Sequence, residues 1–261
     1  MTNRPPLVVC YISGSGSEVE DFSDPHWNVM AQELVRQGFA PGRYARAVVD
    51  WRPMFAKPNR RAQQQAQPGG PWKAAADLFI DVAGDALPYL YSLAKRKQVW
   101  SYVRGVLRRA TLKIPPSRRG GERLMLIGHS FGCQIIFDYL KRWQNKPGKH
   151  ALTQFINGRT LAAVAMMGSP LWLTLSCQSM PIALDFPGSL DPLGTAWVSY
   201  KDKQDMIGVE ACGDFLRHED VIVSNPGLIG LTPGSHNGYY KNRDVAIGCA
   251  RLVAANLGGT C

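Results

Sequence analysis

The chain has 261 residues, of which 45% are apolar, and a formal net charge of +10 at pH 7. This length fits one large domain or two small ones, and the apolar content is ample for a hydrophobic core, which excludes a chain that is disordered throughout. The positive charge suggests a nucleic acid or an anionic membrane as partner. No nucleic-acid-binding motif accompanies the charge, so no nucleic-acid partner is expected.

Targeting and redox signals are sparse. No segment reaches the eighteen or so apolar residues of a membrane-spanning helix. The first apolar run, Leu7–Ile12, is too short for the core of a signal peptide and lacks a small-residue cleavage site. The six cysteines form no C-x-x-C pair, so neither a zinc site nor a redox motif is predicted. These features favour a reduced, cytoplasmic protein, and export by a non-classical route stays open.

The start of the chain reads as strand, helix and strand. Leu7–Ile12 is predicted to be a buried strand, and a Gly/Ser loop over residues 13–17 follows it at once. That loop lacks the lysine and the spacing of a phosphate-binding motif, so we expect its N–H groups to face an oxyanion instead. Trp27–Gln37 has the apolar spacing of an amphipathic helix, and Tyr44–Trp51 is the second predicted strand.

Residues 53–119 differ in character and are predicted to form a helical cap or lid inserted between strands of the sheet. Two helices are expected within this insertion, over Trp72–Leu87 and Tyr89–Leu112. Lysines and arginines gather over residues 95–119, which predicts contact with an anionic membrane surface. A packed helix with a solvated basic side is the alternative interpretation.

A strand, a turn and a helix around Ser130 form the strongest functional signal. The apolar strand Leu124–Ile127 runs into Gly-His-Ser-Phe-Gly at residues 128–132, and an apolar helix over Cys133–Leu140 follows. This is the context of a nucleophile elbow, in which the glycines make room for a strained turn that presents the serine hydroxyl. The turn also aims the N–H of Phe131 at the same space. The alternative is a Gly-rich turn whose serine only caps the helix.

The rest of the chain continues the alternation of strands and helices. Further strands are predicted at Leu161–Met167, Trp197–Tyr200 and Asp220–Ser224, and a last helix at Val245–Leu257. This alternation indicates an α/β fold whose sheet is mostly parallel and flanked by helices. We expect residues 1–261 to form a single domain that carries the cap.

A nucleophilic serine needs a base, and the base needs an acid that holds its tautomer. In this type of sheet, acid and base follow the serine in the order Asp or Glu, then His. His236 lies after the last predicted strand, where a base belongs. Asp205 is favoured over Asp202 as the acid, because the apolar residues after it, Met206 and Ile207, could anchor the loop beneath the histidine. Weaker alternatives are Asp185, Asp191 and Glu210.

Together these segments resemble the lipase and esterase branch of the α/β-hydrolase superfamily. The similarity covers most of the chain outside the insertion, and its motifs lie at residues 12–16, 128–132, 167–171, 197–205 and 235–239. It implies an α/β-hydrolase fold: a mostly parallel central sheet flanked by helices, with a helical cap. One departure is a serine at position 13, where such enzymes usually carry a histidine.

The resemblance implies a serine hydrolase that cleaves carboxylic esters through an acyl-enzyme. Ser130, His236 and Asp205 would be nucleophile, base and acid, and the N–H groups of Phe131 and Ser15 would form the oxyanion hole. No metal or organic cofactor is needed. Alternatives are an amidase or thioesterase with the same triad, or a non-catalytic module that binds a membrane or a partner through the basic cap. Aromatic residues near the cap predict a small-molecule or lipid ester with an apolar acyl group: Trp72, Tyr89, Tyr91 and Trp100.

Overall fold

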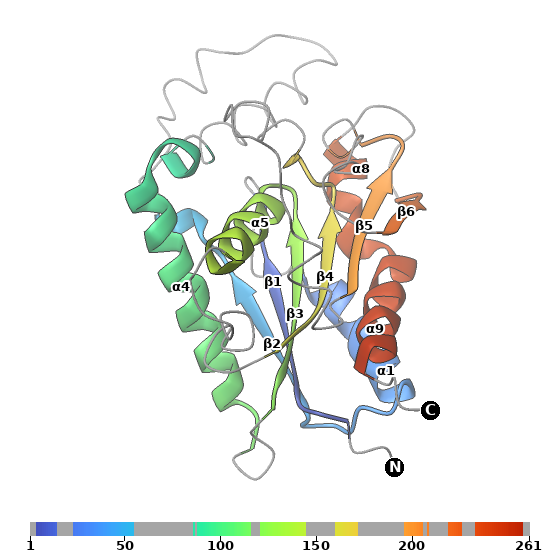
Figure 1. Cartoon of the computed structure of the whole chain (residues 1–261). Coiled ribbons are helices and arrows are strands. Elements are labelled where there is room, and N and C mark those ends of the chain that lie inside the picture. Colours follow the sequence, from blue (N-terminus) through green and yellow to red (C-terminus); the bar gives the residue numbers. More distant parts are fainter. Residues whose placement is uncertain are drawn as a thin grey trace.

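The sequence folds around one parallel sheet. Its six strands lie in the order β2-β1-β3-β4-β5-β6, and every neighbouring pair is parallel (Figure 1). The predicted α/β fold with a parallel sheet flanked by helices is therefore confirmed. A computed structural model of the chain describes residues 4–14, 23–54, 86, 88–115, 121–144, 160–171, 196–205, 208, 219–225 and 233–257.

The strands form where the sequence has short apolar runs. In β1 every residue is buried, because helices cover both faces of the sheet at its centre. In the edge strand β6 every residue is exposed or half-buried instead. The strands are β1 (Leu7–Ile12), β2 (Tyr44–Val49), β3 (Arg123–His129), β4 (Thr160–Met167), β5 (Ala196–Asp202) and β6 (Glu219–Val223).

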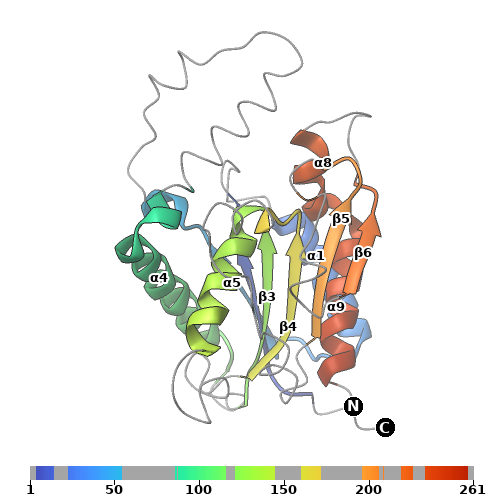
Figure 2. The ribbon, with the colours of Figure 1, turned by 45° about the horizontal axis from the view of Figure 1, so that its top comes forward.

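In the part of the chain that the structure describes, two long helices pack on each face of the sheet. Helices α4 (Leu93–Leu112) and α5 (Phe131–Gln144) share one face, and α1 (Asp24–Arg36) and α9 (Arg243–Leu257) share the other (Figures 1 and 2). Successive side chains of a strand point to opposite faces, so alternate residues of β1 enter the two apolar cores. The result is a three-layer α/β arrangement.

The order of the strands creates a topological switch point at their carboxyl ends. The chain leaves β1 through α1 on one face and leaves β3 through α5 on the other, although the two strands are neighbours. The connections therefore diverge, and ligands of open α/β sheets bind at such a point. The short helix α8 (Pro233–Asn237) lies at the same edge (Figure 2), followed by η4 (Gly238–Lys241). Another short helix, η1 (Arg52–Met54), follows β2.

The structure corrects part of the predicted insertion over residues 53–119. Helix α4 begins at Leu93 rather than Tyr89, and its apolar side, which includes Val99 and Val103, is fully buried in the core beside β1 and β2. This helix is thus a layer of the fold rather than a cover over the strand ends. Apart from Ala86, the predicted helix over Trp72–Leu87 lies outside the described residues, and a cap there stays a prediction.

Other differences concern boundaries. Helix α1 begins at Asp24 rather than Trp27, because its first turn carries a proline and an acid, which suit a helix start but not an apolar pattern. His236 lies in the short helix α8 rather than in an open loop. Among the described helices, none is both long and apolar enough to cross a membrane.

Candidate active site

Ser130 occupies a strained turn between β3 and α5. Its φ of +51° is the only positive value among the described residues that are not glycine. The Ser130 N–H donates to the oxygen of Met167 at 2.9 Å, and the Ser130 carbonyl accepts from the Cys133 N–H at 2.9 Å. Left-handed backbone is costly for a serine and persists only where its surroundings impose it. Here the end of β4 and the first turn of α5 impose it.

Two glycines let the loop after β1 touch this turn. A Cβ atom on Gly132 would lie 2.1 Å from the carbonyl oxygen of Ile12, and one on Gly14 would lie 2.7 Å from Cβ of Ser130. Neither distance is tolerable, so both positions require glycine while the backbones stay in place. The start of the loop after β1, at Gly14, thus lies directly against Ser130.

His236 and Asp205 form a buried pair at the same edge. Nδ1 of His236 lies 2.9 Å from both carboxylate oxygens of Asp205, and the residues are only 2% and 1% exposed. A carboxylate only accepts, so the proton sits on Nδ1 and Nε2 is left as a base. This is the tautomer that a general base for a serine hydroxyl needs.

Gly168, directly after β4, joins the pair to the serine turn. It follows Met167, which holds the Ser130 N–H, and a Cβ on it would lie 3.0 Å from Cε1 of His236 and 2.7 Å from Oδ2 of Asp205. Ser130 Oγ and His236 Nε2 are both buried, and neither has a hydrogen-bond partner within the described part of the chain. In enzymes without substrate such contacts are often long and tighten on binding.

Asp202 has a different task from Asp205. Its carboxylate accepts from the main-chain N–H groups of Gln204, at 2.8 Å, and Asn225, at 2.6 Å. Asp202 therefore ties the turn after β5 to the end of β6, whereas Asp205 contacts His236. The weaker acid alternatives lie outside the described residues: Asp185, Asp191 and Glu210.

The structure describes one of the two predicted oxyanion-hole donors. The N–H of Phe131 opens α5, where the first N–H groups have no partner within the helix. Its ring packs against those of Trp51 and Tyr89, at centroid distances of 5.4 and 5.5 Å. Ser13 directs its N–H and its hydroxyl to the Val49 oxygen, so it anchors the loop. Ser15, the predicted second donor, lies outside the described residues.

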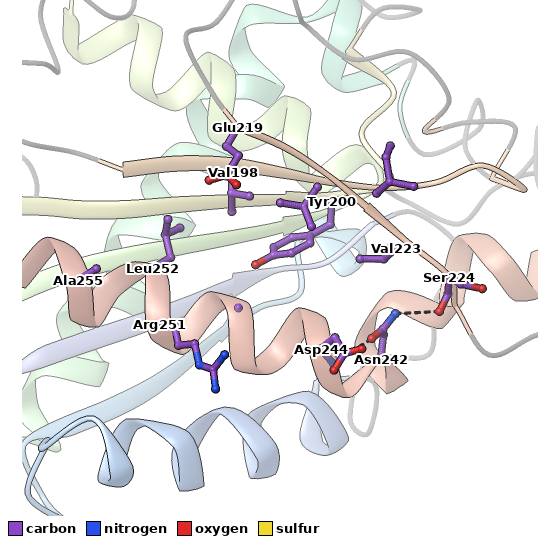
Figure 3. A pocket seen from close by; sticks show the side chains of 13 residues that line it. Val198, Tyr200, Glu219, Val223, Ser224, Asn242, Asp244, Arg251, Leu252 and Ala255 are labelled. Atoms are coloured by element: carbon purple, nitrogen blue, oxygen red, sulfur yellow. Dashed lines mark hydrogen bonds between the residues drawn. The ribbon is translucent and has the colours of Figure 1, made fainter.

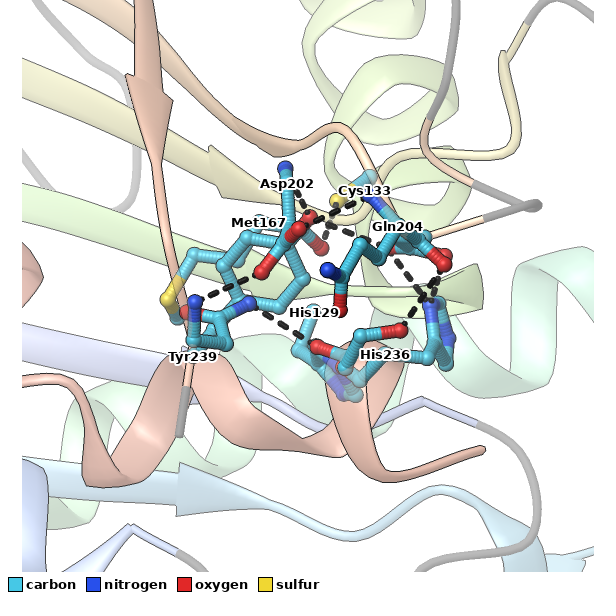
Figure 4. Close-up of polar contacts among 10 residues, drawn as sticks. His129, Cys133, Met167, Asp202, Gln204, His236 and Tyr239 are labelled. Carbon is cyan, nitrogen blue, oxygen red and sulfur yellow. Dashed lines mark hydrogen bonds and ion pairs between the residues drawn. The ribbon is translucent and has the colours of Figure 1, made fainter. Parts of the chain in front are cut away.

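Sequence reasoning missed two supporting side chains, His129 and Tyr239 (Figure 4). Nε2 of His129 lies 2.6 Å from the main-chain oxygen of His236. Tyr239 donates its hydroxyl hydrogen to Oδ2 of Asp205 at 2.9 Å. Strand alternation puts His129 on the α9 face, and this was the one signal that could have suggested its contact with the segment after β6.

No family model matches the chain, and no curated protein matches it significantly. The assignment of chemistry therefore depends on geometry. Within the described ranges, no three His, Cys, Asp or Glu side chains gather in a way that could hold a metal ion. What the site does contain is a hydroxyl, an imidazole whose Nδ1 faces a carboxylate, and that buried carboxylate, which are the side-chain types that nucleophilic acyl transfer uses.

A separate cavity of about 540 Å³ lies between α9 and the strands β5 and β6 (Figure 3). Val198, Val221 and Leu252 form apolar parts of its wall, and Glu219 and Arg251 contribute charged groups. None of the three residues Ser130, Asp205 and His236 lines this cavity. It is therefore distinct from the candidate active site.

Proposed function

We propose that this chain is a serine hydrolase of the α/β-hydrolase type that cleaves carboxylic esters. The observation that carries the proposal is the buried Asp205–His236 pair beside a serine held at φ +51°. Nucleophile, acid and base follow β3, β5 and β6 in the chain order Ser, Asp, His, which supports this fold type over other serine-enzyme folds. All three belong to the edge where open α/β sheets bind ligands.

In this mechanism, Ser130 Oγ attacks the ester carbonyl carbon while Nε2 of His236 takes the hydroxyl proton. The N–H of Phe131 stabilises the resulting oxyanion, and loss of one such donor typically raises the barrier by about 3–4 kcal/mol. The tetrahedral species expels the alcohol, which receives the proton from Nε2, and an acyl group remains on Ser130. Water then repeats the sequence, with its proton going to His236, and releases the carboxylic acid.

The neighbourhood of Ser130 favours an ester with an apolar, lipid-like acyl group. Phe131, Trp51 and Tyr89 form a buried aromatic cluster beside the turn. These three side chains are fully buried, so they mark the apolar layer next to Ser130; an acyl chain that enters this layer would gain about 25 cal/mol per Å² of its own surface buried. Amidase and thioesterase activities use the same triad, and a panel of matched esters, amides and thioesters separates them by relative kcat/KM.

The test is labelling with a fluorophosphonate, which reacts with activated serines. We expect wild type to be labelled and the variants Ser130→Ala and His236→Ala, checked for folding by circular dichroism, to stay unlabelled. Folded wild type that is not labelled, with or without detergent, would overturn the proposal in favour of a non-catalytic module. In that case Ser130→Ala would leave partner binding unaltered.

The exposed face of α4 supports the proposal that the protein meets its substrate at an anionic lipid surface. No acidic residue occurs between residues 88 and 115, and the exposed cations of this stretch are Lys97, Arg104, Arg108, Arg109 and Lys113. Exposed apolar side chains flank them, with Tyr91 74%, Leu93 51% and Leu112 60% exposed. Cations near a membrane surface contribute about 1 kcal/mol each, and aromatic residues favour the interface.

A further inference from the structure

The hydroxyl of Tyr239 bridges the proposed acid and the strand that precedes it. It lies 2.8 Å from the main-chain nitrogen of Asp202 and 2.9 Å from Oδ2 of Asp205. An N–H only donates, so the phenol oxygen accepts from Asp202 and the phenol hydrogen goes to Asp205. The direction of both hydrogen bonds is therefore fixed.

These bonds form a chain that converges on the carboxylate of Asp205, the proposed acid. The N–H of Asp202 donates to Tyr239, Tyr239 donates to Asp205, and Asp205 accepts the Nδ1–H of His236. The outer end is anchored as well, because the Asp202 carboxylate holds the N–H of Asn225 after β6. Main-chain groups thus hold the outer end of this chain of hydrogen bonds.

Tyr239 is itself rigidly placed. Its side chain is fully buried. The residue lies only three positions after His236, in η4, and η4 follows α8 directly. A Cβ on Gly168 would lie 2.9 Å from Cε2 of its ring, so the ring fills the space that this glycine leaves. One short segment therefore supplies the base and the hydroxyl that orients the acid.

The phenol is always a donor in this environment. Burial, and then the adjacent Asp205 carboxylate, raise the pKa of Tyr239 above its ordinary value. The carboxylate thus receives hydrogen bonds from Tyr239 and His236 together, which fixes the plane of the carboxylate and spreads its charge. Hydrogen bonds to a charged group are stronger than those between neutral groups.

We propose that Tyr239 is a positioning residue of the Ser130–His236–Asp205 triad, which sets the orientation and the basicity of Asp205. This inference rests on the proposed ester hydrolysis. Tyr239 touches neither the substrate nor the reacting atoms and acts only through Asp205. Without its hydroxyl, the carboxylate would lose an orienting donor and would hold the protonated imidazole more strongly.

The test compares Tyr239→Phe with Tyr240→Phe, which removes an equally buried hydroxyl from the neighbouring ring that packs against His129 and His26. For Tyr239→Phe we expect kcat on an activated ester to fall about 10- to 100-fold with little change in KM. The acidic limb of its pH–rate profile should move to higher pH. In Tyr240→Phe the limb should stay in place.

A near-isosteric variant covers the case in which Tyr239→Phe does not fold. Fluorotyrosine at position 239 is a stronger donor, so the acidic limb should move to lower pH. An unmoved limb in both Tyr239 variants overturns the proposal.

A readout without substrate separates this inference from the proposed function. The downfield proton resonance of the His236 Nδ1–H reports its bond to Asp205, and it should shift in Tyr239→Phe but not in Tyr240→Phe. A shift in a protein without esterase activity would contradict the proposed function but support the role of Tyr239 in orienting Asp205. An unchanged resonance in an active enzyme would contradict only the role of Tyr239.

Discussion

Nε2 of His129 lies 2.6 Å from the main-chain oxygen of His236, so the residue before the proposed nucleophile is bonded to the backbone of the proposed base. The carbonyl oxygen only accepts, which places the His129 proton on Nε2. Burial, with a smaller contribution from the nearby His236, lowers the pKa of His129 to about 3, so its ring is neutral at ordinary pH. The contact pins α8 against the end of β3, and the two rings lie 4.8 Å apart.

This contact predicts opposite outcomes for two substitutions of His129. His129→Phe keeps a ring but leaves the buried carbonyl of His236 without its donor, which typically costs about 1–3 kcal/mol. We expect its kcat on an activated ester to fall about 10-fold or more. His129→Gln retains an N–H and should recover most of the loss. Equal losses in the two variants, measured with thermal unfolding in parallel, would contradict a role for the hydrogen bond.

The two aspartates near His236 should respond differently to replacement by asparagine. Asp205→Asn presents an amide to Nδ1 and favours the wrong imidazole tautomer, so kcat should fall by roughly 10⁴-fold, as in other triads. Asp202→Asn should mainly lower the unfolding temperature, because its carboxylate holds two main-chain N–H groups. Steady-state kinetics and thermal unfolding of both variants check this. A larger loss of kcat in Asp202→Asn would reverse the assignment of the acid.

The central fold could be predicted because its signals are local. The run before Gly128 contains only apolar residues, and a glycine-flanked serine followed by another apolar run predicts a strand, a turn and a helix. The parallel sheet follows from repeated strand and helix patterns, and chain order alone pairs His236 with an acid after β5. Asp205 is favoured over Asp202 by the neighbouring apolar residues, and it is the carboxylate that contacts His236.

The supporting contacts could not be predicted, because they depend on how distant elements meet. His129 and His236 lie 107 positions apart, and nothing local to either indicates that α8 lies across the end of β3. The same holds for α4: its amphipathic pattern predicts a buried side, but does not say that this side packs on β1 and β2. An apolar helix face looks alike in a cap and in a sheet layer.

Gly168 should not tolerate even an alanine. Its φ is +56°, and an added Cβ would lie 2.7 Å from Oδ2 of Asp205 and 3.0 Å from Cε1 of His236. We expect Gly168→Ala to lower both the unfolding temperature and kcat by displacing the pair.

Gly105, inside α4, provides the matched control for that substitution. The nearest atom to its added Cβ is the flexible end of Arg109 at 3.5 Å, so Gly105→Ala should stabilise the protein by about 1 kcal/mol without a change in kcat. Gly168→Ala with wild-type kinetics would show that the site adapts, contrary to the expected displacement.

Asp138, in α5, should make stability fall as pH rises. Burial raises the pKa of its carboxyl to about 6, although the hydrogen bond from Gln134 at 2.9 Å opposes the shift. Between the ordinary pKa and this value the folded state binds more protons than the unfolded state, so the free energy of unfolding decreases through this window. Asp138→Asn removes this dependence. The free energy of unfolding of Asp138→Asn minus that of wild type, both from urea unfolding, should increase by about 1–2 kcal/mol between pH 5 and pH 8. A difference that does not change with pH would contradict the raised pKa.

The basic face of α4 predicts selective binding to anionic vesicles. At low salt we expect wild type to sediment with phosphatidylserine-containing vesicles and not with neutral phosphatidylcholine vesicles, because only the former attract the cations of α4. Low salt is used because at 0.1 M salt charges are screened over about 10 Å, which weakens the attraction. Charge reversal at the exposed residues Arg108 and Arg109 should weaken the partition by about 30-fold or more.

The control for this experiment reverses Lys241 and Arg243, which are exposed around the start of α9 on the other side of the sheet. It changes the net charge equally, so it separates a local surface from the overall charge of +10. Equal weakening in both double variants would show that the overall net charge, and not the face of α4, causes the binding to anionic vesicles. Equal partition of wild type between the two kinds of vesicle would contradict the preference for an anionic surface, because the exposed apolar side chains of α4 alone would not distinguish the lipids.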